Sequence, residues 1–271
     1  MPIRYSLLMR LLYLVTCSLM STLLLSCDVV TVATPDGTPS FNSQHLNTWL
    51  LQSSGIELRY EQWNSPENIS DIITIVRLDP KHIHLSVDYH PDQPLTMNSW
   101  MKQTGAQVLI NGGYFDKNYR PSGLLISDGE AHGASYQGFG GMLAVDASGR
   151  ISLRSLGEQP YDPSEQLQQV TQSAPLLMLN GQRTQFTANS VNDRRSVVAI
   201  DKHGNLLFIV SPGRAFTLDE LADILVSSDL ELKTALNLDG GASTGFYVNT
   251  HGQQQVSIEP FTALPIVIAV K

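Results

Sequence analysis

Two glycine pairs, each after an apolar run, are the first places where this sequence could do chemistry. They are Asn111-Gly112-Gly113 after the run 108–110 and Asp239-Gly240-Gly241 after the run 235–238. Glycine allows positive φ and close backbone approach, so the chain can reverse while Asn111 or Asp239 projects from a strand end. Backbone amides after such a turn can face an anion. The same pattern is typical of tight β-turns whose polar side chain stabilises its own backbone, so both interpretations stay open at this point.

Arg195 and Ser243 are further candidates because of what surrounds them. Arg195 precedes the apolar run 196–200, and a guanidinium at a strand start can grip a phosphate or carboxylate through two parallel hydrogen bonds. A surface ion pair with Asp193 would explain the same arginine. Ser243 lies in a G-x-S-x-G sequence, but a strand pattern follows it where a serine-hydrolase nucleophile requires a helix. A serine hydrolase is therefore disfavoured.

No spacing typical of a metal, nucleotide or nucleic-acid site is present. His82 and His84 share one strand face without a nearby third ligand, and there is no H-E-x-x-H, P-loop or G-x-G-x-x-G sequence. The formal net charge is −8, from 17 Lys and Arg against 25 Asp and Glu, so no basic surface for nucleic acid is expected. We expect no metal, no cofactor and no nucleic-acid partner.

The N-terminal residues resemble the signal peptide of a bacterial lipoprotein. Residues 1–26 hold two arginines and no acid, with an apolar run at 11–25 that is shorter than the roughly 20 residues of a membrane span. The run ends just before Cys27, which we expect to be lipidated and to anchor the chain to a membrane. Asp28 resembles the residue that retains such proteins on the periplasmic face of the inner membrane. An ordinary signal peptide and an uncleaved anchor are the alternatives.

The remaining sequence must supply the elements that position the candidates. Composition, with 42% hydrophobic and 15% charged residues, is that of a globular domain and excludes a disordered or many-pass membrane chain. Residues 27–54 are rich in Thr, Pro, Ser and Gly, which is typical of a tether, and residues 55–271 are expected to form one domain. Removal of Cys17 with the signal peptide leaves one cysteine, which excludes a disulfide within the mature chain.

Alternating and β-branched runs predict many strands and few helices in this domain. The expected strands are 56–63, 72–78, 82–89, 108–110, 123–126, 142–145, 151–153, 176–179, 196–200, 206–210, 235–238, 245–248 and 265–270. A short helix is expected within 94–105, and another over 218–226, where Thr217 and Glu220 form a capping box. The sequence predicts an α+β fold, a strand-rich single domain with a mixed β-sheet and few helices.

The order of several segments resembles the phosphodiester glycosidase family, which includes bacterial exopolysaccharide-associated proteins. The segments that carry the resemblance are 110–115, 173–175, 195–200, the helix after Thr217, and 235–243. The similarity extends over about residues 72–271. It implies an enzyme that hydrolyses a sugar-1-phosphodiester at the anomeric carbon, releasing a free sugar and a phosphomonoester. The expected partner is a phosphate-linked glycan or glycolipid of the cell envelope.

The resemblance also suggests roles for the candidate residues. A phosphomonoester is a good leaving group, so the site needs an anion clamp and a carboxylate more than a strong general acid. Arg195 and the amides of Gly112 and Gly113 would clamp the phosphate. Asp239 would stabilise the reacting carbon or activate water, with Asn111 orienting sugar hydroxyls. The expected substrate-binding set is completed by Tyr114, Gly240, Gly241 and Ser243.

Two other functions use the same residues. The first is a non-catalytic envelope lipoprotein that binds a glycan through these turns without turnover. The second is a metal-assisted phosphodiesterase that cleaves the P–O bond, with oxygen ligands from Asp116, Glu130 and Asp239.

Overall fold

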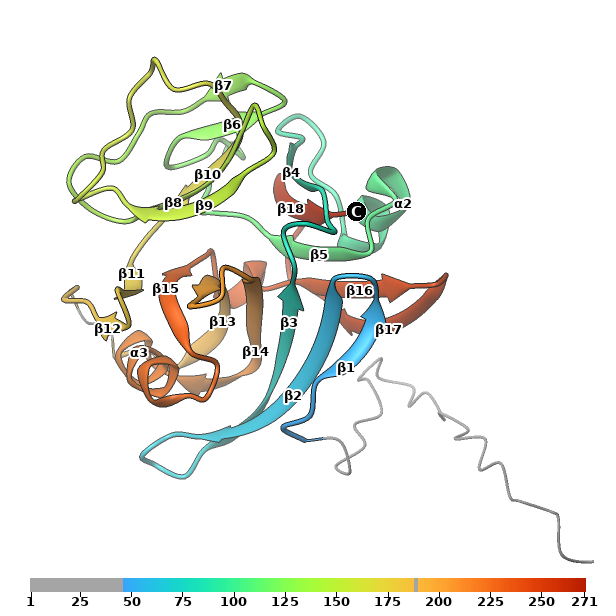
Figure 1. The fold of residues 1–271 in the computed structure, drawn as a ribbon, viewed down its shortest axis with the longest axis vertical. Coiled ribbons are helices and arrows are strands. Elements are labelled where there is room, and N and C mark those ends of the chain that lie inside the picture. The colour runs from blue at the N-terminus through green and yellow to red at the C-terminus, as the bar shows by residue number, and fades with distance from the viewer. Residues whose placement is uncertain (1–45, 188–189) are drawn as a thin grey trace, which may run out of the picture. The chain divides into compact units, whose positions relative to one another are not determined.

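The computed structural model describes residues 46–187 and 190–271, which form three β-sheets and two α-helices (Figure 1). The largest sheet has the order β1 (Leu50–Ser53), β2 (Ile56–Asn64), β3 (Ser70–Leu78), β14 (Leu206–Phe216), β13 (Asp193–Asp201), β15 (Leu232–Asn237), β11 (Leu176–Leu179), β12 (Gln182–Arg183). The second has the order β7 (Glu130–His132), β6 (Leu125–Ser127), β10 (Leu167–Ser173), β8 (Gly141–Asp146), β9 (Ile151–Ser155). The third has the order β17 (Gln253–Ile258), β16 (Phe246–Thr250), β5 (Val108–Asn111), β18 (Ile266–Val270), β4 (Leu85–Tyr89).

The strand-rich α+β class is confirmed, but the expected mixed sheet is not found. Every pairing between the named strands of the described residues is antiparallel, and a parallel contact occurs as an isolated bridge between Leu46 and Tyr60. The chain also divides its strands among three sheets instead of one. Alternating sequence patterns specify which residues face a core, but they contain no information on the direction of the partner strand.

Among the described residues, five strands lie where the sequence predicted none: β1, β7, β10, β12 and β17. β1 falls inside the expected tether, and its pairing with β2 extends the domain to residues before 55. β10 lacks clear alternation because three of its buried residues, Gln169, Thr171 and Gln172, are polar. Their side chains serve as hydrogen-bond partners for neighbouring main chain: Gln169 Oε1, for example, accepts from the Val87 amide at 2.9 Å. The buried side-chain amide of Gln169 therefore forms a hydrogen bond where an apolar side chain would form a packing contact.

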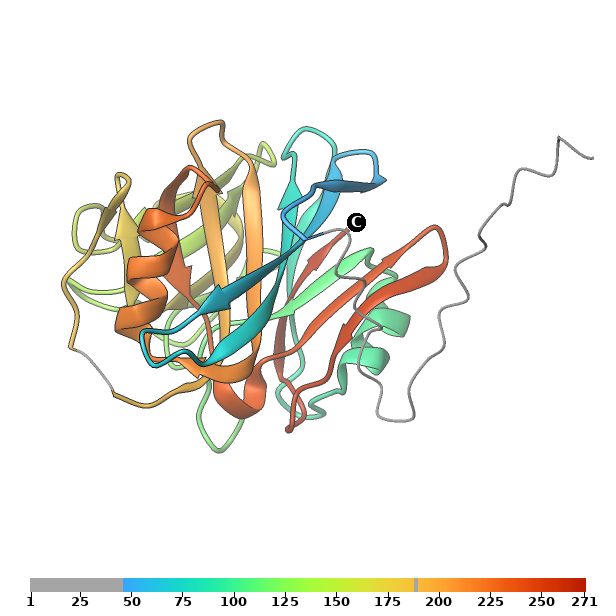
Figure 2. The ribbon, with the colours of Figure 1, turned by 90° about the horizontal axis from the view of Figure 1, so that it is seen from below.

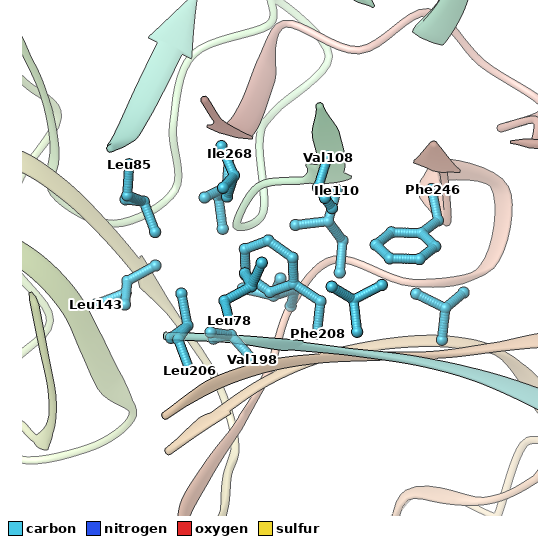
Figure 3. Close-up of a cluster of buried hydrophobic side chains, with 14 of the residues drawn as sticks. Leu78, Leu85, Val108, Ile110, Leu143, Val198, Leu206, Phe208, Phe246 and Ile268 are labelled. Atoms are coloured by element: carbon cyan, nitrogen blue, oxygen red, sulfur yellow. The ribbon is translucent and has the colours of Figure 1, made fainter. Parts of the chain in front are cut away.

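The core lies where the three sheets meet. Figure 3 shows Phe208 and Val198 of the largest sheet facing Ile110 and Phe246 of the third, with Leu143 of the second at their side. All five side chains are fully buried. Because the sheets share this core, strand ends of different sheets are brought to the same region of the molecule.

Each helix covers an outer face of one sheet. α3 (Leu218–Ser227) packs its apolar stripe against the largest sheet (Figure 2), and the predicted capping box of Thr217 and Glu220 is confirmed. α2 (Met97–Thr104) packs Trp100 and two methionines against the third sheet.

No helix in residues 46–187 and 190–271 is long and apolar enough to cross a bilayer. Cys27 and the expected signal peptide of residues 1–26 lie outside these residues, so lipidation stays a prediction.

Candidate active site

The antiparallel pairing of β13 with β15 places Arg195 and Asp239 at the same edge of the largest sheet. Val197 pairs with Asn237 in this register. Arg195 lies two positions before Val197 and Asp239 two positions after Asn237, so both extend from the same end of the paired strands. Two residues that are remote in sequence are thereby brought together by strand pairing alone.

Asn111 connects the third sheet to this edge. Its Nδ2 donates to the main-chain oxygen of Asp239 at 2.7 Å, while its Oδ1 accepts from Ser196 Oγ at 2.7 Å and from the Gly245 amide at 3.2 Å. The side chain is 1% exposed. These bonds occupy the amide within the protein and hold the main chain of Asp239. The geometry therefore favours a positioning role for Asn111 over direct contact with sugar hydroxyls.

The carboxylate of Asp239 is half-buried and held in place by its own turn. Its Oδ1 accepts from the Gly240 amide at 2.9 Å, and the side chain of Ser243 donates a second hydrogen bond. Burial raises the pKa of Asp239 above its ordinary value of 3.8, and the two hydrogen bonds oppose that rise. Asp239 is thus a desolvated carboxylate in a constrained position, as a general base or an electrostatic stabiliser requires.

Tyr114 is close enough to both charged groups for each to affect its ionisation. Its hydroxyl oxygen accepts from Asn237 Nδ2 at 2.8 Å. Burial, followed by the charge of Asp239, raises the pKa of Tyr114 to about 12, and the Arg195 cation acts in the opposite direction. At neutral pH the phenol therefore keeps its proton. With its oxygen already accepting from Asn237, that proton is available to a bound phosphate or sugar oxygen.

Arg195 is a buried cation held by neutral groups. Its side chain is enclosed, its Nε donates to the Phe216 carbonyl at 3.2 Å, and its Nη2 donates to the Val191 carbonyl at 2.6 Å. Burial lowers the pKa of Arg195, and the nearby charge of Asp193 opposes this. No carboxylate of the described residues forms an ion pair with Arg195. A fixed guanidinium without a paired carboxylate is suited to binding an anion.

Gly112 and Gly113 are required for packing, in contrast to the expected anion clamp. The Gly112 amide donates to the Ile266 carbonyl at 3.0 Å and the Gly113 amide to Thr171 Oγ1 at 3.3 Å. Both donors are therefore already used. A Cβ on Gly112 would lie 2.3 Å from Ile266 Cγ2, and one on Gly113 would lie 2.3 Å from the main-chain oxygen of Gln172.

Gly240 and Gly241 allow the turn after β15 to pass over the start of β13. Gly241 has φ of 58°, and a Cβ there would lie 2.7 Å from Asp193 Oδ2. A Cβ on Gly240 would lie 2.9 Å from the main-chain oxygen of Arg194. These glycines position Asp239 and Ser243 by close backbone approach.

The structure adds residues to the site that the sequence did not single out. Asn237 joins Tyr114 to the Ala174 carbonyl, which its Nδ2 reaches at 3.2 Å. Tyr136 lies close enough to Asp239 for that charge to contribute to the rise in its pKa, after burial. Asn237 lies in one of the segments that carry the family resemblance, but nothing in the sequence distinguishes it there from an ordinary buried strand residue. Nothing in the sequence around Tyr136 distinguishes it from other loop tyrosines.

The carboxylates considered as metal ligands have separate surroundings. Asp116 Oδ1 accepts from the amides of Asn118 at 2.8 Å and Arg120 at 2.9 Å, which closes a local turn. Glu130 is exposed on the edge strand β7 beside His132. Within the part of the chain that the structure describes, no three His, Cys, Asp or Glu side chains form a group able to hold a metal ion.

Comparisons with known proteins agree with the fold and the motif order. A family model described as phosphodiester glycosidase matches residues 104–271. The uncharacterised protein YigE of Escherichia coli (strain K12) is 30% identical over 152 residues, which cover 52% of this chain and 58% of that protein. The match thus spans less than two thirds of that relative's length.

Two solved structures share the fold. The catalytic domain of zebrafish N-acetylglucosamine-1-phosphodiester alpha-N-acetylglucosaminidase, auto-inhibited by its pro-peptide, superposes with a TM-score of 0.63 at 19% identity, covering 82% of this chain and 85% of that one. A hypothetical protein from Synechocystis has a TM-score of 0.63 at 17% identity, covering 82% of this chain and 63% of that one. At these identities the likeness concerns the fold.

Proposed function

The chain belongs to the phosphodiester glycosidase family, and from that premise we propose that it hydrolyses a sugar-1-phosphodiester at the anomeric carbon. The observation that carries the proposal is the arrangement around Tyr114. Strand pairing brings Asp239 and the buried Arg195 to the same end of β13 and β15, where the Tyr114 hydroxyl accepts from Asn237 Nδ2 at 2.8 Å. A sugar-1-phosphodiester presents the matching pair of groups, an anomeric carbon that becomes positive and an adjacent phosphate that is negative.

In the proposed reaction, water attacks the anomeric carbon and the bond from that carbon to the phosphate oxygen breaks. The electron pair of that bond leaves with the phosphomonoester, so the oxygen needs little protonation. Arg195 and the Tyr114 hydroxyl stabilise the phosphate. Asp239 stabilises the positive charge that develops on the sugar, or accepts the proton of the attacking water. The free sugar and the phosphomonoester are the two products.

We place the substrate in the cell envelope, as a phosphate-linked glycan or glycolipid. This part of the proposal is supported by the signal-peptide pattern and Cys27 at the N-terminus. The name of the zebrafish relative supplies a suitable first probe, a diester of N-acetylglucosamine-1-phosphate.

Hydrolysis in isotope-labelled water tests which bond breaks. With the methyl diester of N-acetylglucosamine-1-phosphate as substrate, we expect the heavy oxygen in the reducing sugar, trapped at once by reduction, and none in methyl phosphate. Label in the phosphate would show P–O cleavage and would support the phosphodiesterase alternative. Binding of the diester without any product would support the glycan-binding alternative.

The pH dependence should reveal the ionisation of Asp239. Because burial raises its pKa, the acidic limb of kcat/KM should lie above pH 3.8, the ordinary value for aspartate. Ser243 stabilises the ionised form through its hydrogen bond, so Ser243→Ala should raise that pKa further and move the limb to higher pH. The measurement is a kcat/KM profile of both proteins over the acidic range.

Thr244→Val is the matched control for this shift. The Thr244 hydroxyl is buried beside Ser243 and has no hydrogen-bond partner within the described residues. Its removal should leave the acidic limb unchanged. An identical limb in wild type, Ser243→Ala and Thr244→Val would argue against Asp239 as the group that titrates.

A further inference from the structure

A pocket of about 550 Å³ lies between the loop around Phe139 and the β11–β12 hairpin. Aromatic rings and neutral polar groups line it together, and no lining residue is charged. The groups used below are Phe139, Phe186, Pro175, Ser155, Thr184 and Gln185. A site of this composition suits an uncharged ligand that has both apolar faces and hydroxyl or amide groups, because an unpaired charge buried there would remain unsatisfied.

Asn237 connects this pocket to the Asp239 site. Its main-chain amide donates to the Pro175 carbonyl at 3.1 Å. Its side-chain Nδ2 donates to the Ala174 carbonyl at 3.2 Å and to the Tyr114 hydroxyl at 2.8 Å. Ala174 and Pro175 are part of the pocket wall. One asparagine thus contacts the wall of the pocket and the hydroxyl at the centre of the candidate active site.

Phe139, which lines the pocket, forms an aromatic surface together with Tyr136. Their rings stack with centroids 4.7 Å apart and planes 28° apart. The Tyr136 ring is held against Gly140, and its amide donates to Gln172 Oε1 at 2.9 Å. Phe139 is 54% exposed, so one face of a positioned ring remains available to a ligand. Pyranose rings present C–H faces that pack on such surfaces, much as aromatic rings pack on each other.

The order of the groups indicates which part of the substrate occupies the pocket. The Asp239 charge acts on both Tyr114 and Tyr136, whereas Arg195 acts on Tyr114. In the largest sheet, β15 leads into Asp239 and lies between β13, which carries Arg195, and β11, whose Leu176 and Leu179 line the pocket. Asp239 therefore follows the strand between the guanidinium and the pocket. If Asp239 faces the anomeric carbon and Arg195 faces the phosphate, the sugar ring extends toward Phe139.

We propose that this pocket binds the sugar whose anomeric carbon is attacked, and that this sugar is uncharged, its ring packed on Phe139 beside neutral side chains such as Thr184 and Gln185. The assignment rests on the proposed function for the orientation of the substrate. The binding of a neutral sugar in the pocket can nevertheless be measured without turnover. Anionic sugars such as uronic acids are disfavoured because the lining offers no cation.

Saturation-transfer NMR with free sugars tests the pocket directly on the full chain. We expect N-acetylglucosamine to receive saturation at its ring protons and glucuronic acid to receive little. Phe139→Tyr should keep the signal, while Phe139→Ala and Phe139→Leu should both lose most of it, since leucine restores bulk but not a flat face. Leu51→Ala, which truncates a side chain that is 75% exposed on β1, is the matched surface control and should behave as wild type.

Kinetics give the second measurement. For the methyl diester of N-acetylglucosamine-1-phosphate, Phe139→Ala should raise KM about 3- to 10-fold, with inhibition by inorganic phosphate unchanged. Full binding in Phe139→Leu would indicate an acyl chain or another apolar occupant and would overturn the proposal. Equal binding of glucuronic acid would also overturn it. So would a KM change in Phe139→Ala that varies with the leaving group of the diester, because Phe139 would then contact the leaving group instead of the sugar. Sugar binding that depends on Phe139 without turnover of any diester would keep the pocket and reject the hydrolysis.

Discussion

Asp239→Asn should lower kcat by about 10²- to 10³-fold or more, because it removes the negative charge nearest to the reacting carbon in a water-poor site. The substituted amide keeps an oxygen that can accept from the Gly240 amide and from Ser243. Geometry is therefore preserved while charge is lost. The measurement is kcat with the methyl diester, together with the affinity for inorganic phosphate, which should stay nearly unchanged since Arg195 supplies the anion contact.

The stability of the same variant separates chemistry from folding. Burial raises the pKa of Asp239 in the folded state, so the ionised carboxylate destabilises the fold as pH rises from 3.8 through the folded pKa. Asp239→Asn should therefore keep or increase Tm at neutral pH. Asp92→Asn, at an exposed loop position, is the matched control and should retain full activity. Activity of Asp239→Asn above a tenth of wild type would reject the assigned role.

Arg195→Lys should lower kcat/KM by about 10²-fold and weaken inhibition by inorganic phosphate by a similar factor. An ammonium group cannot reproduce a planar grip on phosphate while also donating to the Phe216 and Val191 carbonyls. Loss of those buried bonds should also reduce the free energy of unfolding by about 1–3 kcal/mol. Diester kinetics and phosphate inhibition measure the first effect, and thermal denaturation the second.

Arg194 is a matched control for this substitution. It is equally buried on β13, and its guanidinium donates to the Pro212 carbonyl at 3.1 Å and the Glu259 carbonyl at 3.0 Å, with Phe261 stacked 4.4 Å away. Arg194→Lys should lower stability by a similar amount and leave phosphate affinity intact. If both variants lose phosphate affinity equally, the anion site is not specific to Arg195.

The elements next to the site could be predicted because their signals are local. The capping box at Thr217 specifies a helix start through contacts within one turn, and that helix is observed over Leu218–Ser227. The apolar runs before Asn111 and Asp239 form the buried strands β5 and β15. The order of those segments was enough to indicate the family, because it depends on residue types and spacing alone.

The sequence by itself determined most of the strands, where the two glycine turns lie, and which charged groups stand at strand ends. Tertiary structure decided how these are used. Asn111 became a buried link because Ser196 of β13 and Gly245, just before β16, donate to its side-chain oxygen, and the amide of Gly113 donates to Thr171. Such partners are distant in sequence, and a hydrogen bond leaves no periodic signal in either segment. Whether a polar side chain faces substrate or another strand is therefore settled when the three sheets pack together.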